Sequence, residues 1–146
     1  MPQARSMAFV IDPAFLAGSD AVGNLQLCHV RLQPDARFCW LVLIPQLDGL
    51  REIEDLSPVD RGRLTEEIVL VGGAVRAVGE ALGRPVEKLN VGQLGNLTAQ
   101  LHIHVVGRRS DDPAWPAPVW GFGKAEVLTA LAHDTALAAA RRALGL

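Results

Sequence analysis

The sequence predicts an α+β fold in which one long helix and a C-terminal helix pack on an antiparallel sheet. Short apolar runs come in two neighbouring pairs, as hairpin-connected strands do. Between the pairs, apolar residues recur at helical spacing, and an Ala- and Leu-rich segment closes the chain. The chain has 146 residues, of which 49% are hydrophobic. We therefore expect a single domain over residues 1–146 with a well-buried core.

The first part of the chain predicts a short helix and a β-hairpin. Asp12 suits a helix N-cap and Pro13 the first helical position. Residues 25–32 alternate apolar and polar side chains, which is typical of a strand with one buried face. Residues 38–44 form a nearly continuous apolar run, which indicates a strand covered on both faces. A turn at Pro34-Asp35 joins the two strands.

A long helix is predicted to follow. Ser57 can cap its start, and Pro58 occupies the first helical position. Asp60 lies in the first turn, where the helix dipole favours a carboxylate. Gly83 ends the helix. Its buried face is expected to consist of Leu64, Ile68, Val71, Val75, Val78 and Leu82.

The second half of the chain predicts another pair of strands and the C-terminal helix. The strands are expected over residues 86–91 and 99–106, joined by a turn at 92–96 that contains two glycines. Residues 111–123 are rich in Pro, Trp and Gly and predict irregular structure. The Ala- and Leu-rich stretch 124–144 predicts the C-terminal helix.

Composition excludes several classes of protein. Fourteen basic and sixteen acidic residues give a net charge of −2, whereas proteins that bind nucleic acid in general are usually basic. The longest apolar run, Cys39–Pro45, is far shorter than a membrane span. The N-terminus shows no apolar stretch after a basic cluster, so no signal peptide is predicted. We expect a cytoplasmic protein whose partners include neither nucleic acid nor membrane.

The fourth predicted strand carries polar side chains on one face. Because side chains alternate along a strand, Gln100, His102 and His104 should point the same way, roughly 6.6–7 Å apart. Three interpretations are open: a hydrogen-bonded structural pair, two imidazole ligands of a metal site, and an imidazole nucleophile that attacks phosphorus. The remaining histidines, His29 and His133, lie in no second ligand-like cluster, and we assign them structural roles.

The segment from Gln100 to Val106 resembles the motif of the histidine triad (HIT) family, His-φ-His-φ-His-φ-φ, with Gln in place of the first His. Other segments, in the same order as in that family, extend the resemblance over most of the chain: Trp40-Leu-Val-Leu-Ile-Pro45, Asp55-Leu-Ser-Pro58, Asn90, Gly95-Asn96 and Trp115-Pro116. The resemblance implies a HIT-like fold and a homodimer. Trp115 and Trp120 would then serve in packing or at an interface.

The resemblance implies a nucleotidyl hydrolase or transferase that attacks a nucleotide α-phosphorus and needs no cofactor or metal. Its substrate would be a purine nucleotide, as a phosphoramidate, or a dinucleotide, as a dinucleoside polyphosphate. His102 maps to the nucleophile, whose other ring N–H must be held by a carbonyl or carboxylate. His104 would hydrogen-bond the phosphoryl oxygens or assist the leaving group. Gln100 would donate its amide N–H to a phosphate oxygen, and it cannot carry a proton.

Two departures from the family pattern affect the leaving group. Gln100 replaces the first His of the motif, and Trp40 stands where a further His is usual. Both changes leave the nucleophile in place. They favour, as an alternative, a nucleotide-binding protein with little turnover. A metal-binding domain that uses the pair His102 and His104 is the other alternative.

Five residues are further candidates for substrate binding. The resemblance places Asn90 at the phosphate pocket, and the backbone and amides around Gly95 and Asn96 could line it, although a plain hairpin turn explains this segment too. Asp35 could bind a ribose hydroxyl or serve only in the turn. Arg108 could meet a phosphate or be solvated.

Overall fold

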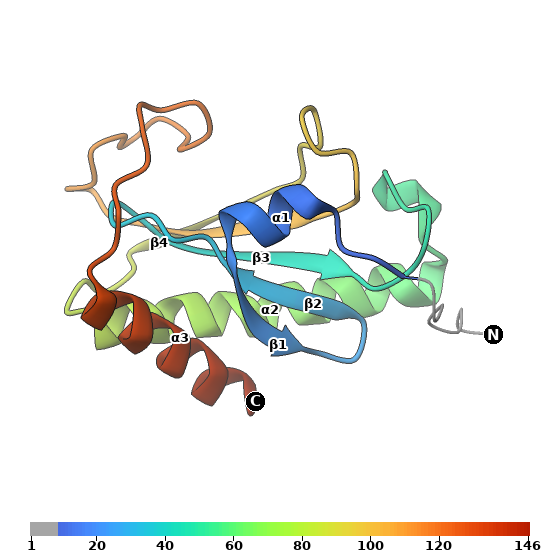
Figure 1. Cartoon of the computed structure of the whole chain (residues 1–146), viewed down its shortest axis with the longest axis horizontal. Coiled ribbons are helices and arrows are strands. Elements are labelled where there is room, and N and C mark those ends of the chain that lie inside the picture. The colour runs from blue at the N-terminus through green and yellow to red at the C-terminus, as the bar shows by residue number, and fades with distance from the viewer. Residues whose placement is uncertain (1–8) are drawn as a thin grey trace.

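The computed structural model describes residues 9–146, and it confirms the predicted fold class (Figure 1). One antiparallel sheet has the strand order β1-β2-β3-β5-β4. In chain order the elements are α1 (Pro13–Gly18), β1 (Asp20–Asn24), β2 (Cys28–Leu32), β3 (Cys39–Pro45), a 3-10 turn η1 (Ile53–Asp55), α2 (Pro58–Ala81), β4 (Lys88–Gly92), β5 (Ile103–Arg108) and α3 (Ala130–Leu144). None of the helices in residues 9–146 has the length and apolar character needed to cross a membrane.

The two faces of the sheet are covered by different elements. On β2 and β3, side chains such as Val30, Leu41 and Leu43 join residues of α2 and α3 in the larger core cluster. The alternate residues of β3, among them Val42, pack on the other face in a smaller cluster that includes Phe15 of α1. Figure 1 shows α1 and the long loops on one side of the sheet and α3 on the other. The strand alternation thus divides the sheet into a helix-covered face and a face partly open to solvent.

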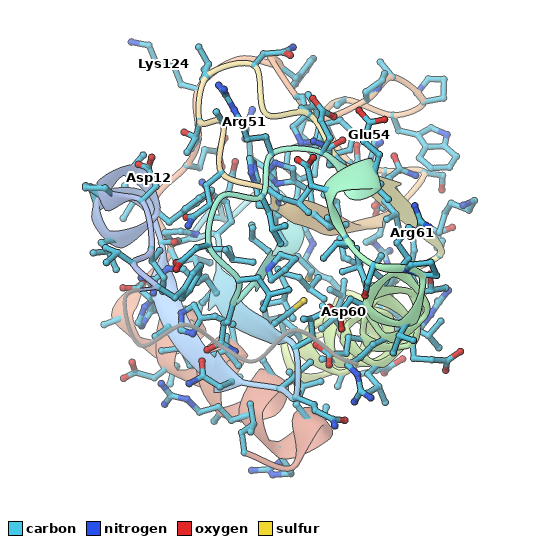
Figure 2. All side chains as sticks on the ribbon, turned by 90° about the vertical axis from the view of Figure 1, so that its right-hand side faces the viewer. Asp12, Arg51, Glu54, Asp60, Arg61 and Lys124 are labelled. Carbon is cyan, nitrogen blue, oxygen red and sulfur yellow. The ribbon has the colours of Figure 1, made fainter. Side chains whose placement is uncertain are left out.

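The predicted helix starts are confirmed by their caps. The Asp12 carboxylate accepts a hydrogen bond from the Ala14 N–H at 2.9 Å, and the Ser57 hydroxyl accepts one from the Asp60 N–H at 3.1 Å. Each cap satisfies one of the N–H groups that a helix start leaves unpaired. Figure 2 looks along α2 with Asp60 and Arg61 near the helix start, while Asp12 lies across the molecule.

The first predicted strand is a hairpin. β1 and β2 pair on either side of a turn at residues 25–27, where the sequence predicts one strand over 25–32. A contact with α2 fixes this turn, because the buried Glu67 carboxylate accepts hydrogen bonds from the Leu27 and Cys28 N–H groups, both at 2.8 Å. The pattern of residues 25–32 contains no sign of this partner, since Glu67 is 39 or more positions away.

Three other elements differ from their predicted boundaries. β5 begins at Ile103 rather than at residue 99, because the Leu101 N–H bonds to the Leu50 carbonyl, outside the sheet, at 2.9 Å. α3 begins at Ala130 rather than at residue 124. Thr129 caps it, while the preceding segment returns to the β2–β3 turn through a hydrogen bond from Ala36 N–H to the Glu126 carbonyl. β4 is shifted slightly, to Lys88–Gly92 from the predicted 86–91.

Candidate active site

A pocket of about 520 Å³ lies on the face of the sheet that α1 partly covers. It brings together the end of α1, single residues of β3 and β5, the loop that precedes β5, and the segment around Trp120. Both central histidines line it. The full lining is Ala14, Phe15, Gly18, Ser19, Gln33, Trp40, Leu94, Gly95, Asn96, Leu97, Thr98, His102, His104, Trp120 and Gly121.

His102 is held by a backbone carbonyl. Its Nδ1 lies 2.7 Å from the carbonyl oxygen of Gln100, and only 5% of the residue is exposed. Because a carbonyl oxygen can only accept, Nδ1 carries a hydrogen, and in the neutral ring the lone pair is then on Nε2. The ring packs edge-on against Phe15, with centroids 4.8 Å apart. These contacts fix both the orientation and the tautomer of the imidazole.

His104 is held in the opposite way. The indole Nε1 of Trp40 lies 3.0 Å from its Nδ1, and an indole N–H can only donate. Nδ1 of His104 therefore carries the lone pair, and the ring hydrogen is on Nε2. Burial, together with the neighbouring His102, lowers the pKa of His104 to about 4. At neutral pH this side chain is an uncharged hydrogen-bond donor.

The two imidazoles are neighbours with different chemistry. Their ring centroids are 4.9 Å apart and the planes meet at 77°. The tautomers leave a nucleophilic nitrogen on His102 and an N–H donor on His104. This is the combination that attack on phosphorus needs, with a donor for the charge that develops on oxygen.

The aromatic wall beside His104 was not predicted as part of the site. The rings of Trp40 and Trp120 lie 5.6 and 5.7 Å from the His104 ring. Trp120 can approach because Gly92 has no side chain, since a Cβ there would lie 2.8 Å from the indole. The sequence predicted Trp120 as a packing or interface group, and it marked Trp40 as part of a family-like strand at a position where a His is usual.

The Gln100 side chain is engaged by the segment before α1, which the sequence did not predict. Gln100 precedes β5, and its side chain holds the N-terminal segment instead of lining the pocket. Its amide nitrogen donates to the Val10 carbonyl at 2.9 Å, and its amide oxygen accepts from the Asp12 N–H at 2.8 Å. With both ends of the amide engaged, Gln100 anchors α1, which carries Phe15 onto the His102 ring.

Three of the predicted substrate-binding residues lie outside the pocket. Arg108 is buried and forms an ion pair with Asp112 at 2.7 Å, and it donates to the Asn90 side chain at 2.8 Å. Asp35 accepts from the Arg37 backbone N–H and pairs with the Arg37 guanidinium at 2.8 Å, which is the turn role. These side chains form hydrogen bonds and ion pairs with one another. The sequence could not show this, because it does not reveal which side chains are in contact.

The loop before β5 forms part of the pocket. Gly95 and Asn96 line the pocket together with Thr98. Gly95 has a φ of 81°, a left-handed conformation that suits glycine. The loop therefore serves as both a turn and a wall of the pocket.

Within residues 9–146, no group of three or more His, Cys, Asp or Glu side chains is arranged to hold a metal ion. His102 and His104 could supply two imidazoles, and each of their Nδ1 atoms is already engaged by Gln100 or Trp40. A closed metal site usually takes four ligands. The described residues therefore give the metal-binding alternative little support.

Comparison with known proteins gives a consistent result. The family model "HIT domain" matches residues 17–111. A solved histidine triad protein from Sinorhizobium meliloti 1021 is 42% identical, with a TM-score of 0.84, and the match covers 94% of this chain and 98% of that one. A histidine triad protein from Bradyrhizobium japonicum is 35% identical, with a TM-score of 0.85 and the same coverage. One from Marinobacter aquaeolei VT8 is 32% identical, with a TM-score of 0.84 and coverage of 94% and 96%. No curated protein gives a significant match.

The fold, an antiparallel sheet with one long helix and a C-terminal helix, matches that of solved histidine triad proteins. Because the family model spans more than half of the chain, and these relatives exceed 30% identity over nearly their whole length, the chain belongs to the HIT domain family. Membership supports a nucleotide-related function.

The anchoring role of Gln100 can be tested by replacement with alanine. Gln100→Ala removes both hydrogen bonds to the N-terminal segment, so we expect faster amide hydrogen exchange in residues 9–18 and a stability loss of about 1–2 kcal/mol. Mass spectrometry of exchanged peptides measures the first effect and denaturant unfolding the second. Gln93→Ala is the matched control, since its amide bonds only to the adjacent Leu94 carbonyl. Unchanged exchange in residues 9–18 would contradict the anchoring role.

Proposed function

We propose that this protein is a nucleotidyl hydrolase or transferase that attacks a nucleotide α-phosphorus through His102. The observation that carries the proposal is the hydrogen bond from His102 Nδ1 to the Gln100 carbonyl, which places the lone pair of the neutral ring on Nε2, in a residue that lines the pocket. Family membership and the open pocket, large enough for a nucleotide, support it.

The proposed reaction has two steps. In the first, His102 Nε2 forms a bond to phosphorus while the bond to the leaving group breaks, which gives a nucleotidyl-histidine. The Nδ1–H···O=C hydrogen bond to Gln100 stabilises the positive charge that develops on the His102 ring. In the second, water or another acceptor attacks phosphorus, the P–N bond breaks, and the neutral imidazole returns.

The site favours leaving groups that depart as stable anions. His104 is held uncharged, and Gln100 is engaged with the N-terminal segment and has no proton to transfer. Departure therefore depends on a hydrogen bond from His104 Nε2–H rather than on transfer of a stored proton. A phosphate-linked leaving group, as in a dinucleoside polyphosphate, suits this arrangement better than an amine that must be protonated.

The setting in the cell and the assembly are part of the proposal. We infer a cytoplasmic homodimer that acts on a purine nucleotide or dinucleotide. Trp115 is 40% exposed, and Val91 on the edge strand β4 is 50% exposed, so apolar surface is available for a second copy.

The covalent step is tested by intact-mass spectrometry. The protein is mixed with a diadenosine polyphosphate or adenosine phosphoramidate in the presence of EDTA and quenched in alkali, because a P–N bond is acid-labile. We expect an adduct of one nucleotidyl group, or released nucleotide if hydrolysis is fast. His102→Ala should abolish both, because the nucleophile is gone. His133→Ala is the control, since His133 lies on α3 and pairs with Asp20.

The outcomes separate the alternatives. An adduct that persists in His102→Ala, or turnover that EDTA abolishes, would contradict the proposal. Nucleotide binding without adduct or product would establish the binding protein with little turnover.

The role of Trp40 is tested by removing only its indole N–H. Trp40→Phe keeps an aromatic ring but leaves His104 Nδ1 without its donor, so the tautomer is no longer fixed. We expect kcat to fall roughly 10-fold while KM changes far less. Trp40→His, which restores a ring N–H, should recover part of kcat. Trp115→Phe serves as the control, because Trp115 does not line the pocket. An equal loss in Trp40→Phe and Trp40→His would show that Trp40 acts only by filling space.

A further inference from the structure

Arg31 on β2 is a buried cation next to the pocket. It is 5% exposed, and its Nε and Nη2 donate to the hydroxyl and carbonyl oxygens of Ser19 at 2.6 and 2.7 Å. Its Nη1 lies 3.1 Å from His29 Nε2, while His29 Nδ1 lies 2.6 Å from the Asn24 side-chain oxygen. All of these partners are neutral groups, since burial and the adjacent Arg31 lower the pKa of His29.

Among the described residues, the other buried arginine, Arg108, and the half-buried Arg37 have acidic partners, whereas Arg31 has none at ion-pair distance. Arg108 pairs with Asp112 at 2.7 Å, and Arg37 pairs with Asp35 at 2.8 Å. Within residues 9–146, no carboxylate oxygen lies within 4.0 Å of the Arg31 guanidinium, and residues 1–8 include no acidic residue. Asp20 is near enough to attract Arg31, but it is 48% exposed at its side chain and is paired with His133. The charge of Arg31 is therefore only partly offset.

The sheet register places Arg31 in line with the histidines. Arg31 is paired with Val42 on β3, and Val42 is paired with His104 on β5. Two strand spacings separate the backbones of Arg31 and His104, which is about 10 Å. The neighbouring β2 residues Val30 and Leu32 belong to the core on the helix-covered face, so Arg31 lies on the face that carries the pocket. Ser19, its hydrogen-bond partner, lines that pocket.

The pocket lining, formed by fifteen described residues, contains no acidic side chain and no Lys or Arg. His104 in this lining is neutral at physiological pH. A nucleotide phosphate carries negative charge, and hydrogen bonds alone from the lining would have to offset its desolvation. The Arg31 guanidinium, buried behind the lining residue Ser19 with neutral partners, is screened far less than a surface charge.

We propose that the positive charge of Arg31 makes the pocket selective for anionic ligands. Arg31 acts through its electrostatic field, because Ser19 lies between it and the pocket, and it does not touch the substrate. This inference deepens the proposed function and rests on it for the identity of the anion as a nucleotide phosphate. The chemistry that Arg31 recognises is simply negative charge near His102 and His104, so inorganic phosphate should show the effect too.

Equilibrium binding of three ligands tests the proposal: AMP, adenosine and inorganic phosphate, each measured by calorimetry on the full chain. Arg31→Gln should weaken AMP and phosphate binding roughly 5- to 10-fold and leave adenosine nearly unchanged. Arg31→Lys, which keeps the charge but loses the fork of donors, should stay close to the parent protein. Arg141→Gln is the matched control, because Arg141 also donates to backbone carbonyls of β1, at Ala21 and Val22. It should change none of the three affinities.

The outcomes distinguish an effect of the Arg31 charge on ligand binding from an effect of Arg31 on the local structure. Equal weakening of AMP and adenosine in Arg31→Gln would overturn the proposal, since loss of local structure affects both ligands alike. So would an Arg31→Lys protein that loses its preference for AMP over adenosine, and this variant decides the matter if Arg31→Gln does not fold. Arg31-dependent phosphate binding without nucleotide binding would uphold the role of Arg31 and contradict the nucleotide function. If the parent protein binds neither AMP nor phosphate but still forms the His102 adduct, the nucleotide function is upheld and the role of Arg31 is contradicted.

Discussion

Two hydrogen bonds of opposite sense, one to each central imidazole, are the interactions on which the site depends. The Gln100 carbonyl accepts from His102, and the Trp40 indole donates to His104. A carbonyl has no hydrogen to give and an indole N–H has no lone pair to offer, so neither bond can reverse. Two chemically identical side chains, with ring centroids 4.9 Å apart, thereby become a nucleophile and a donor.

The surrounding structure holds these two bonds in place. Gln100 contributes twice, because its backbone carbonyl orients His102 while its side-chain amide anchors the segment before α1. α1 then carries Phe15 onto the nucleophile. On the other side, Gly92 admits Trp120, which packs against His104 and Trp40. Gln100 and Trp40 thus support the two imidazoles, and both imidazoles line the pocket.

Local pattern and capping chemistry were enough to predict the elements that depend on neighbouring residues. Helix starts at Asp12 and Ser57 are correct, since a cap is a contact over two or three residues. The His102 requirement for a carbonyl partner also follows from chemistry, although the sequence could not name Gln100 as its source. The sequence did not predict the contacts of the Gln100 side chain and Arg108. Each forms a hydrogen bond with a residue distant in the sequence, Val10 and Asn90 respectively, and periodicity does not reveal such partners.

The ring tautomers of the two histidines test the central claim most directly. Long-range hydrogen–nitrogen NMR correlation spectra distinguish which imidazole nitrogen carries the hydrogen. We expect His102 in the Nδ1–H form and His104 in the Nε2–H form, with His104 remaining neutral as the pH is lowered from 7 to about 5, because its pKa is held near 4. The same tautomer on both rings, or protonation of His104 within that pH range, would contradict the division of roles between nucleophile and donor.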